Sequence, residues 1–216
     1  MVYIKRFFTK GGKYAFLIDE AHNLHERARE MYSAEMSLSE LYAPCETEIL
    51  GSLSATKKLA RTASTLLSDL LMPYLSGELR ADKEGRMYGA ATLSEIPSRM
   101  YSLFDEIMKV VEEEIFINQS ATDDESEERL AYLRSYYYKN KKFTDIMARF
   151  DSAYKMFIFY DDGNIRVKLF CLDTSPVIRR CLNKGHGAVL FSATLSPLDY
   201  YRSVLGGERS DEILEV

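Results

Sequence analysis

The sequence lacks long apolar runs, since no stretch approaches the roughly 20 consecutive apolar residues that a membrane-spanning helix needs. Residues 1–12 also lack the apolar core and the small-residue cleavage site of a signal peptide. The three cysteines, Cys45, Cys171 and Cys181, form no CxxC pair, and their odd number fits reduced thiols better than a disulfide framework. We therefore expect an intracellular, cytoplasmic protein without a membrane partner, in which Cys171 and Cys181 are small buried side chains.

Basic residues are missing from one segment and concentrated in the next. Residues 112–128 hold eight acidic and no basic side chains, whereas residues 129–149 hold six basic and one acidic. The whole chain of 216 residues has a net charge of −5, which excludes a basic protein that coats nucleic acid. Any contact with nucleic acid must therefore be local. The 46% of apolar residues suffices for the core of one large or two small domains.

Patterns typical of strands lie near both ends of the sequence. The runs YAFLID, at 14–19, and GAVLFSAT, at 187–194, predict buried strands of a parallel sheet. The segment 155–173 alternates with a period of two around Asp162-Gly163, which predicts a β-hairpin. Residues from about 22 to 155 read as helical. The sequence thus predicts a mixed α/β fold, mainly α, in which a helical insertion is flanked by strands of a sheet domain.

Within the insertion, apolar spacing predicts three long helices. The first covers 48–75, and a polar loop follows at 76–91. The second opens near Pro97, a residue tolerated in a first helical turn, and the third begins near Glu127 and breaks around Asn140. The face expected to pack the first helix is formed by Ile49, Leu53, Ala60, Ala63, Leu67 and Leu70.

Asp19 and Glu20 stand where the first predicted strand ends. Hydrolysis of a nucleoside triphosphate needs a carboxylate near Mg²⁺ and a second one that activates water. In this interpretation Asp19 orients the metal through its water shell, Glu20 activates water, and His22 senses the γ-phosphate. Ser192 and Thr194 stand at the end of the second predicted strand, where their hydroxyls would reach the same sheet edge and couple the site to other elements.

Two simpler interpretations of this segment stay open. Acidic residues favour the first turn of a helix, so Asp19 and Glu20 are also compatible with an ordinary strand running into a helix. His22 and His25 form an H-x-x-H pattern, which together with Asp19 and Glu20 would suit an independent metal-dependent hydrolase. Without a metal, His25 is expected to be a surface residue of the following helix.

The motifs resemble a known family. LIDEAH, at 17–22, resembles motif II of the superfamily 2 helicases, and LFSATLSPLDYYRSVLGG, at 190–207, resembles their motif III in the iron-sulfur XPD/DinG branch. The resemblance implies a RecA-like P-loop motor lobe interrupted by a helical arch domain, with ATP-dependent unwinding of DNA as the activity. It implies ATP and Mg²⁺ as cofactors, single-stranded DNA as a partner, and an iron-sulfur cluster as a possible cofactor of the parent protein.

The sequence also departs from that family. It contains no GxxxxGK[ST] phosphate-binding loop, because Gly12-Lys13 is followed by Tyr14, and it contains no second motor lobe. None of its cysteines matches the cluster ligands. The resemblance therefore implies a middle fragment that is inactive alone, divided into a motor-lobe strand at 1–25, an arch-type insertion at 26–155, a hairpin and return connection at 156–185, and a motor-lobe strand and helix at 186–216.

The segment RSYYYKNKK, at 134–142, combines aromatic and basic side chains. Bases stack on aromatic rings while lysines follow phosphates, so this segment predicts a single-strand contact through Tyr136, Tyr138, Lys139, Lys141 and Lys142. The alternative is that Tyr137 is core, with Tyr136 and Tyr138 at the helix shoulder and the lysines solvated. The same two interpretations, a nucleic-acid contact or a solvated helix face, apply to Lys57, Lys58 and Arg61. A further possibility is that the insertion is a module for docking a protein partner, with incidental DNA contacts.

Overall fold

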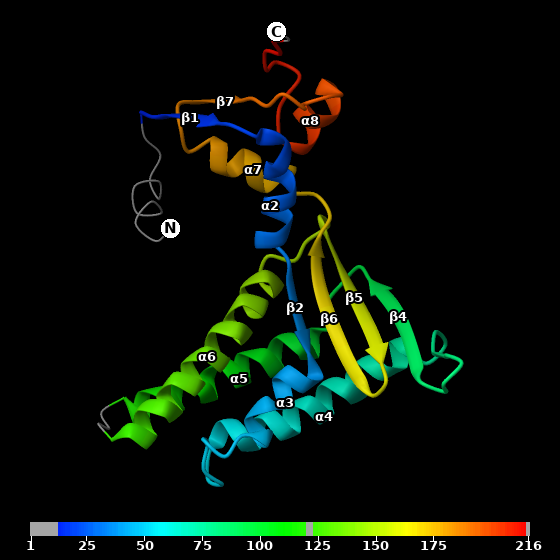
Figure 1. The fold of residues 1–216 in the computed structure, drawn as a ribbon, viewed down its shortest axis with the longest axis vertical. Coiled ribbons are helices and arrows are strands. Elements are labelled where there is room, and N and C mark those ends of the chain that lie inside the picture. The colour runs from blue at the N-terminus through cyan, green and yellow to red at the C-terminus, as the bar shows by residue number, and fades with distance from the viewer. Residues whose placement is uncertain (1–12, 120–122, 215–216) are drawn as a thin grey trace. The chain divides into compact units, whose positions relative to one another are not determined.

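The computed structural model describes residues 13–119 and 123–214 and has a mixed α/β fold (Figure 1). It divides into two compact units. Unit 1 combines residues 1–32 with residues 171–216, and unit 2 spans residues 33–170. The predicted insertion has limits of 26 and 155. None of the helices in the described part of the chain is long and apolar enough to cross a bilayer.

Unit 1 is built around two parallel strands. β1 (Ala15–Ile18) pairs with β7 (Gly187–Leu190), with Ala15 opposite Gly187. The parallel pairing agrees with the prediction, but the expected burial is wrong, because Leu17 is 74% and Val189 56% exposed. A short 3₁₀ helix, η1 (Ala21–Asn23), leads into α2 (Leu24–Met31), and the unit is completed by α7 (Ser175–Leu182) and α8 (Leu198–Val204). Its small core is formed by Ala21, Ala28, Ile178 and Leu205.

Unit 2 contains a five-stranded sheet in the order β2-β6-β5-β4-β3. Its strands are β2 (Ala34–Ser37), β3 (Arg80–Ala81), β4 (Met87–Leu93), β5 (Tyr154–Asp161) and β6 (Asn164–Cys171). The predicted hairpin is confirmed: Asp162 and Gly163, with φ of 43° and 90°, connect β5 to β6.

The polar loop predicted at 76–91 is wrong, because β4 pairs along β5 with Ala91 opposite Ile158. The strand was missed because its side chains are small and carry little apolar signal. A Cβ on Gly89 would lie 3.0 Å from the Glu78 carbonyl oxygen, so the close approach of the backbone favours glycine there.

The helices of unit 2 are α3 (Leu38–Glu46), α4 (Ala55–Leu75), α5 (Ser98–Asn118) and α6 (Asp124–Met147). The predicted start of the first long helix is wrong by seven residues. Ser54 caps α4 by accepting a hydrogen bond from the Lys57 amide at 3.2 Å, and Leu53 lies before the helix, 84% exposed. The buried stripe of α4 therefore consists of Thr56, Ala60, Ala63, Leu67, Leu71 and Leu75.

α6 is continuous, so the predicted break near Asn140 is wrong. The Asn140 side chain is buried and donates a hydrogen bond to the Tyr136 carbonyl at 2.8 Å, which satisfies the amide inside the helix. Asparagine is a weak helix former when its side chain competes for the backbone, but here that contact follows the helix axis.

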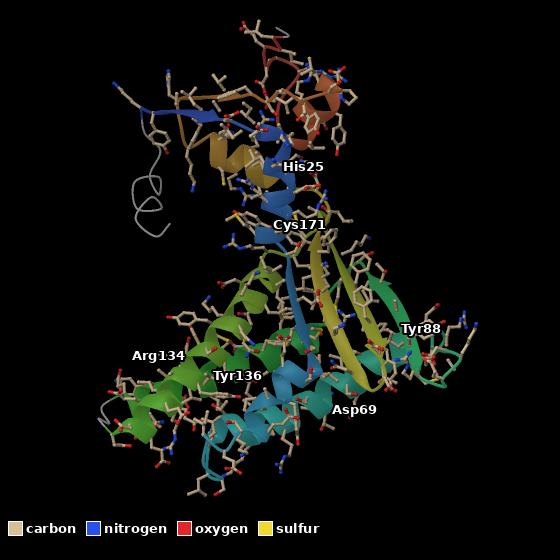
Figure 2. All side chains as sticks on the ribbon, in the orientation of Figure 1. His25, Asp69, Tyr88, Arg134, Tyr136 and Cys171 are labelled. Carbon is tan, nitrogen blue, oxygen red and sulfur yellow. The ribbon has the colours of Figure 1, made fainter. Side chains whose placement is uncertain are left out.

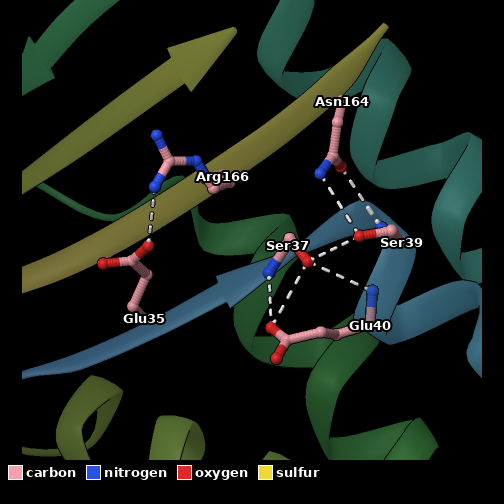
Figure 3. Close-up of polar contacts among 6 residues, drawn as sticks. All are labelled: Glu35, Ser37, Ser39, Glu40, Asn164 and Arg166. Carbon is pink, nitrogen blue, oxygen red and sulfur yellow. Dashed lines mark hydrogen bonds and ion pairs between the residues drawn. The ribbon is translucent and has the colours of Figure 1, made fainter. Parts of the chain in front are cut away.

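The junction of β2 and α3 is fixed by polar contacts (Figure 3). Ser37 and Glu40 form a reciprocal capping box, in which the Glu40 amide donates to Ser37 Oγ and the Ser37 amide donates to Glu40 Oε2, both at 3.1 Å. Asn164 at the start of β6 accepts from the Ser39 amide at 3.3 Å. The first turn of α3 is thereby tied to the central hairpin of the sheet.

Candidate functional site

The carboxyl ends of β1 and β7 bring the predicted site residues together. Because the strands are parallel and in register from Ala15–Gly187 to Ile18–Leu190, the residues that follow them meet at one edge. The pairing continues beyond the strands, where the Phe191 amide donates to the Ile18 carbonyl at 3.0 Å and the Ala21 amide donates to the Phe191 carbonyl at 3.2 Å. Asp19 and Glu20 are thus held beside Ser192.

Glu20, His22 and Ser192 form a closed triangle of polar contacts. Ser192 Oγ donates to Glu20 Oε2 at 3.2 Å, and it lies 2.7 Å from His22 Nδ1. His22 Nδ1 is 3.1 Å from Glu20 Oε2. A carboxylate only accepts hydrogen bonds, so Ser192 gives its proton to Glu20 and its oxygen accepts from His22. A proton on Nδ1 of His22 satisfies both of its contacts, to Ser192 Oγ and to Glu20 Oε2.

This triangle differs from a nucleophilic triad. In a triad, histidine accepts the serine proton at one ring nitrogen and donates to the acid from the other. Here a single nitrogen, Nδ1, faces both Ser192 and Glu20, and the serine proton is directed to the carboxylate. The arrangement does not activate Ser192 as a nucleophile, and it suits a network that senses the state of Glu20.

Glu20 has an unusual backbone conformation. Its φ of 51° and ψ of 41° place it in the left-handed helical region, which costs a residue with a Cβ about 1–2 kcal/mol. The turn is stabilised by the Glu20 amide, which donates to Asp19 Oδ1 at 2.7 Å, and by the Asn23 amide, which donates to the Glu20 carbonyl at 3.0 Å. This backbone conformation directs the Glu20 side chain toward His22 and Ser192. The side chain is 63% exposed and so remains accessible to water.

Thr194 is attached to the same network through Ser192. Its Oγ1 lies 3.2 Å from Ser192 Oγ, and its amide donates to that oxygen at 3.3 Å. Asp19 and Ser192 also line an open groove of about 1380 Å³ in unit 1, with Arg179 and Arg202 on its wall. All five residues predicted from the two motifs, Asp19, Glu20, His22, Ser192 and Thr194, therefore lie in one place.

Comparison with models of known protein families finds no match for this chain, and comparison with curated proteins finds no significant match either.

His25 does not join the site. It is expected on the surface, but His25 (labelled in Figure 2) is only 9% exposed. Its ring packs edge-on against those of Tyr200 and Tyr201, at centroid distances of 6.4 and 6.3 Å. Across residues 13–119 and 123–214, no cluster of three or more His, Cys, Asp or Glu side chains could hold a metal ion. The four-residue metal site considered for a hydrolase is therefore not assembled.

The prediction that Cys171 and Cys181 are buried is confirmed for the first residue and wrong for the second. Cys171 is buried as expected and donates from Sγ to the Asp173 carbonyl at 3.3 Å. Cys181 was also expected to be buried, but it is exposed on α7. The helix directs Ile178 rather than Cys181 into the core of unit 1.

The residues predicted to contact a single strand lie on different sides of α6, some buried and others exposed. Tyr136 is 5% exposed, and its hydroxyl donates to the Leu41 carbonyl at 3.0 Å, so its ring is closed to a base (Figure 2). Burial also raises its pKa. Tyr137, expected in the core, is half-buried and donates to Glu112 at 2.6 Å, a bond that raises its pKa to about 12. The roles of these two tyrosines are thus the reverse of the core interpretation.

The remaining members of the segment face outward. Tyr138 is 68% exposed, Lys139 and Lys142 are exposed, and Lys141 forms an ion pair with Asp145 one turn later. On α4, Lys57 donates to the Thr47 carbonyl at 2.8 Å and so serves the fold, whereas Lys58 and Arg61 are exposed. Only part of the predicted nucleic-acid contact is therefore accessible.

Proposed function

We propose that this chain is part of an ATP-dependent DNA helicase of the XPD/DinG type, in which unit 1 contributes to a RecA-like motor lobe and unit 2 is the arch-type insertion. The observation that carries the proposal is the convergence of Glu20, His22 and Ser192 from two segments 170 residues apart. These are the side chains by which motifs II and III would communicate across one sheet edge.

In this proposal Glu20 positions and deprotonates the attacking water, and His22 and Ser192 sense its charge through Oε2. Asp19 fits Mg²⁺ by its chemistry, since this ion takes one or two carboxylates and completes its shell with water and phosphate oxygens. When bound, Mg²⁺ would neutralise developing charge on the phosphates. The sequence supplies no phosphate-binding loop of its own, so we do not expect the chain to hydrolyse ATP alone.

The exposure of the β1–β7 pair supports a place in a larger sheet. Parallel strands are normally covered on both faces by helices, yet Leu17, Val189 and Phe191 are 74%, 56% and 45% exposed. Such apolar strands gain about 25 cal/mol for each Å² of apolar surface removed from water. Further strands and helices of a motor lobe would supply that cover.

Coupling by Ser192 leads to a prediction for the complete helicase. A Ser192→Ala variant should hydrolyse ATP within about threefold of the wild type, because Glu20 keeps its position through the Asp19 and Asn23 contacts. Strand separation should fall about five- to tenfold, since the loss of an ordinary, largely solvent-exposed hydrogen bond costs about 1–1.4 kcal/mol. Steady-state hydrolysis and the unwinding of a labelled duplex are measured side by side.

A Ser203→Ala variant is the matched control, because Ser203 is exposed on α8 of the same unit. It should leave both rates unchanged. Equal losses of hydrolysis and unwinding in Ser192→Ala would assign Ser192 to the hydrolytic step instead. No change in either rate would remove the coupling role and, with it, the main support for the proposal.

A second candidate function is the docking of a protein partner on unit 2. Leu53 and Ile117 are 84% and 76% exposed and line the same small groove between the start of α4 and the end of α5. Exposed apolar side chains gathered in a groove are typical of an interaction site. This candidate gains weight if unit 2 has no affinity for single-stranded nucleic acid.

A further inference from the structure

The five-stranded sheet of unit 2 has two unlike faces. Met156 and Ile158 of β5, with Val167 and Leu169 of β6, are at most 2% exposed and form the core face. The alternating residues on the other face are half-buried or exposed, although several are large and apolar. We call this second surface the open sheet face and define it by Lys155, Phe157, Phe159, Arg166, Lys168 and Phe170.

The aromatic rings of the open sheet face form a connected group. Phe157 and Phe159 are stacked, with centroids 6.2 Å apart and an angle of 14° between their planes. Phe170 meets Phe157 edge-on at 6.1 Å. Toward the sheet edge, Tyr88 of β4 is 49% exposed and adds another ring (Figure 2). The rings shield one another in part and still present aromatic surface to solvent.

Cations are held over these rings. The Arg166 guanidinium lies 5.5 Å from the Phe159 centroid, and Lys168 Nζ lies 5.0 Å from the Phe170 centroid, both within the range of cation–π attraction. Arg166 is also held by Glu35 of β2 at 3.2 Å, as Figure 3 shows. The aromatic and basic groups are therefore interleaved and oriented before any ligand arrives.

The charge of this surface is opposite to that of the chain. Strand alternation and register place Arg80, Lys155, Arg166 and Lys168 on it, against the two acids Glu35 and Asp161. The chain as a whole has a net charge of −5. An anionic ligand with flat apolar groups is complementary to such a surface, since phosphates match the cations and bases match the rings.

We propose that the open sheet face binds single-stranded nucleic acid, with bases stacking on Phe157, Phe159 and Phe170 and phosphates contacting Arg166 and Lys168. A sheet that presents aromatic rings to unpaired bases is a known solution to single-strand recognition. Aromatic rings and arginine occur at protein interfaces as well, but lysine is depleted there, so Lys155 and Lys168 favour a nucleic acid over a protein as the ligand. The inference rests on the proposed function in one respect: a helicase needs a single-strand contact, and the open sheet face would supply it.

The test is fluorescence anisotropy of labelled single-stranded DNA and RNA of about 15 nucleotides with the 216-residue chain. Phe159→Ala should weaken binding about tenfold or more through lost stacking. Lys168→Gln keeps a polar, partly solvated side chain of similar length, and it should lower the slope of log K against log salt by about 0.7. The matched controls Tyr74→Ala on α4 and Lys184→Gln in unit 1, both exposed, should bind like the wild type.

The outcomes separate this inference from the proposed function. Binding that is lost in Tyr138→Ala and Lys139→Glu on α6 but kept in Phe159→Ala would overturn the open sheet face and leave a single-strand contact elsewhere on unit 2. Displacement of the oligonucleotide by an equally charged polyglutamate peptide at the same concentration would point to an acidic protein ligand and overturn the inference too. Absence of any binding would overturn the inference and the single-strand role of unit 2, while the Ser192 experiment would still test the motor.

Discussion

A Glu20→Gln variant of the complete helicase is expected to hydrolyse ATP about 10²- to 10⁴-fold more slowly than the wild type, which is the range of a lost general base. Glutamine keeps the size of the side chain and can remain beside Ser192 and His22, which now contact Oε2 at 3.2 and 3.1 Å. What it loses is the ability to take a proton from water. Steady-state phosphate release under saturating ATP measures the effect on kcat.

The control for this prediction is Glu26→Gln on α2, an exposed carboxylate that makes the same chemical change outside the site. It should hydrolyse ATP at the wild-type rate. The Glu20→Gln variant should still bind ATP, because the substitution removes the group that takes a proton from water and no contact with the nucleotide. A Glu20→Gln enzyme that retains more than about a tenth of the rate would contradict the role of Glu20.

A Phe104→Ala variant is expected to lower the free energy of unfolding of unit 2 by about 3–5 kcal/mol. Phe104 on α5 is 1% exposed, and its ring lies 5.1 Å from that of Phe143 on α6, so truncation opens a cavity between these two helices. Chemical denaturation of the 216-residue chain, followed by far-ultraviolet circular dichroism, gives the change in midpoint and slope.

Phe116→Ala makes the same substitution on the same helix at a position that is 70% exposed. It should change the free energy of unfolding by less than about 0.5 kcal/mol. Similar values for the two variants would show that α5 does not pack against α6 as described, and with that the core of unit 2 would have to be redrawn.

The sequence was informative where a pattern is local and strong. The Asp162-Gly163 pair predicts the hairpin because Asp-Gly favours the tight type I′ turn, which needs positive φ at both central residues, and those angles are 43° and 90°. Asp19 and Ser192 were placed at one edge because parallel strands end together, and β1 and β7 are parallel. Whether that edge belongs to a RecA-like lobe stays a prediction.

Other features depend on contacts that sequence patterns describe poorly. The pattern fails to predict β4 because Gly89, Ala90 and Ala91 give no alternation, although the missing side chain of Gly89 is what allows the chain to pass close to Glu78. His25 was taken for a surface residue because nothing local signals that Tyr200 and Tyr201, distant in sequence, cover its ring.

The buried face of α6 follows from helical spacing in the sequence. Counting back from Phe143 in steps of three and four gives Asn140, Tyr136 and Leu133, which are the buried residues. The polar Asn140 interrupts that stripe, so Tyr137 was preferred for the core. The open sheet face had a signal as well, since Phe157 and Phe159 alternate with Met156 and Ile158 and make both faces of β5 apolar.

The most direct test of the account is the affinity of the wild-type chain for a labelled single strand and for the matching duplex, measured by anisotropy between about 50 and 200 mM salt. The account predicts that the single strand binds more tightly than the duplex, and that its affinity falls about sevenfold over this range if Arg166 and Lys168 each neutralise one phosphate. Equal affinity for the duplex, or no binding at the lowest salt, would contradict the assignment of unit 2 to a single-strand path.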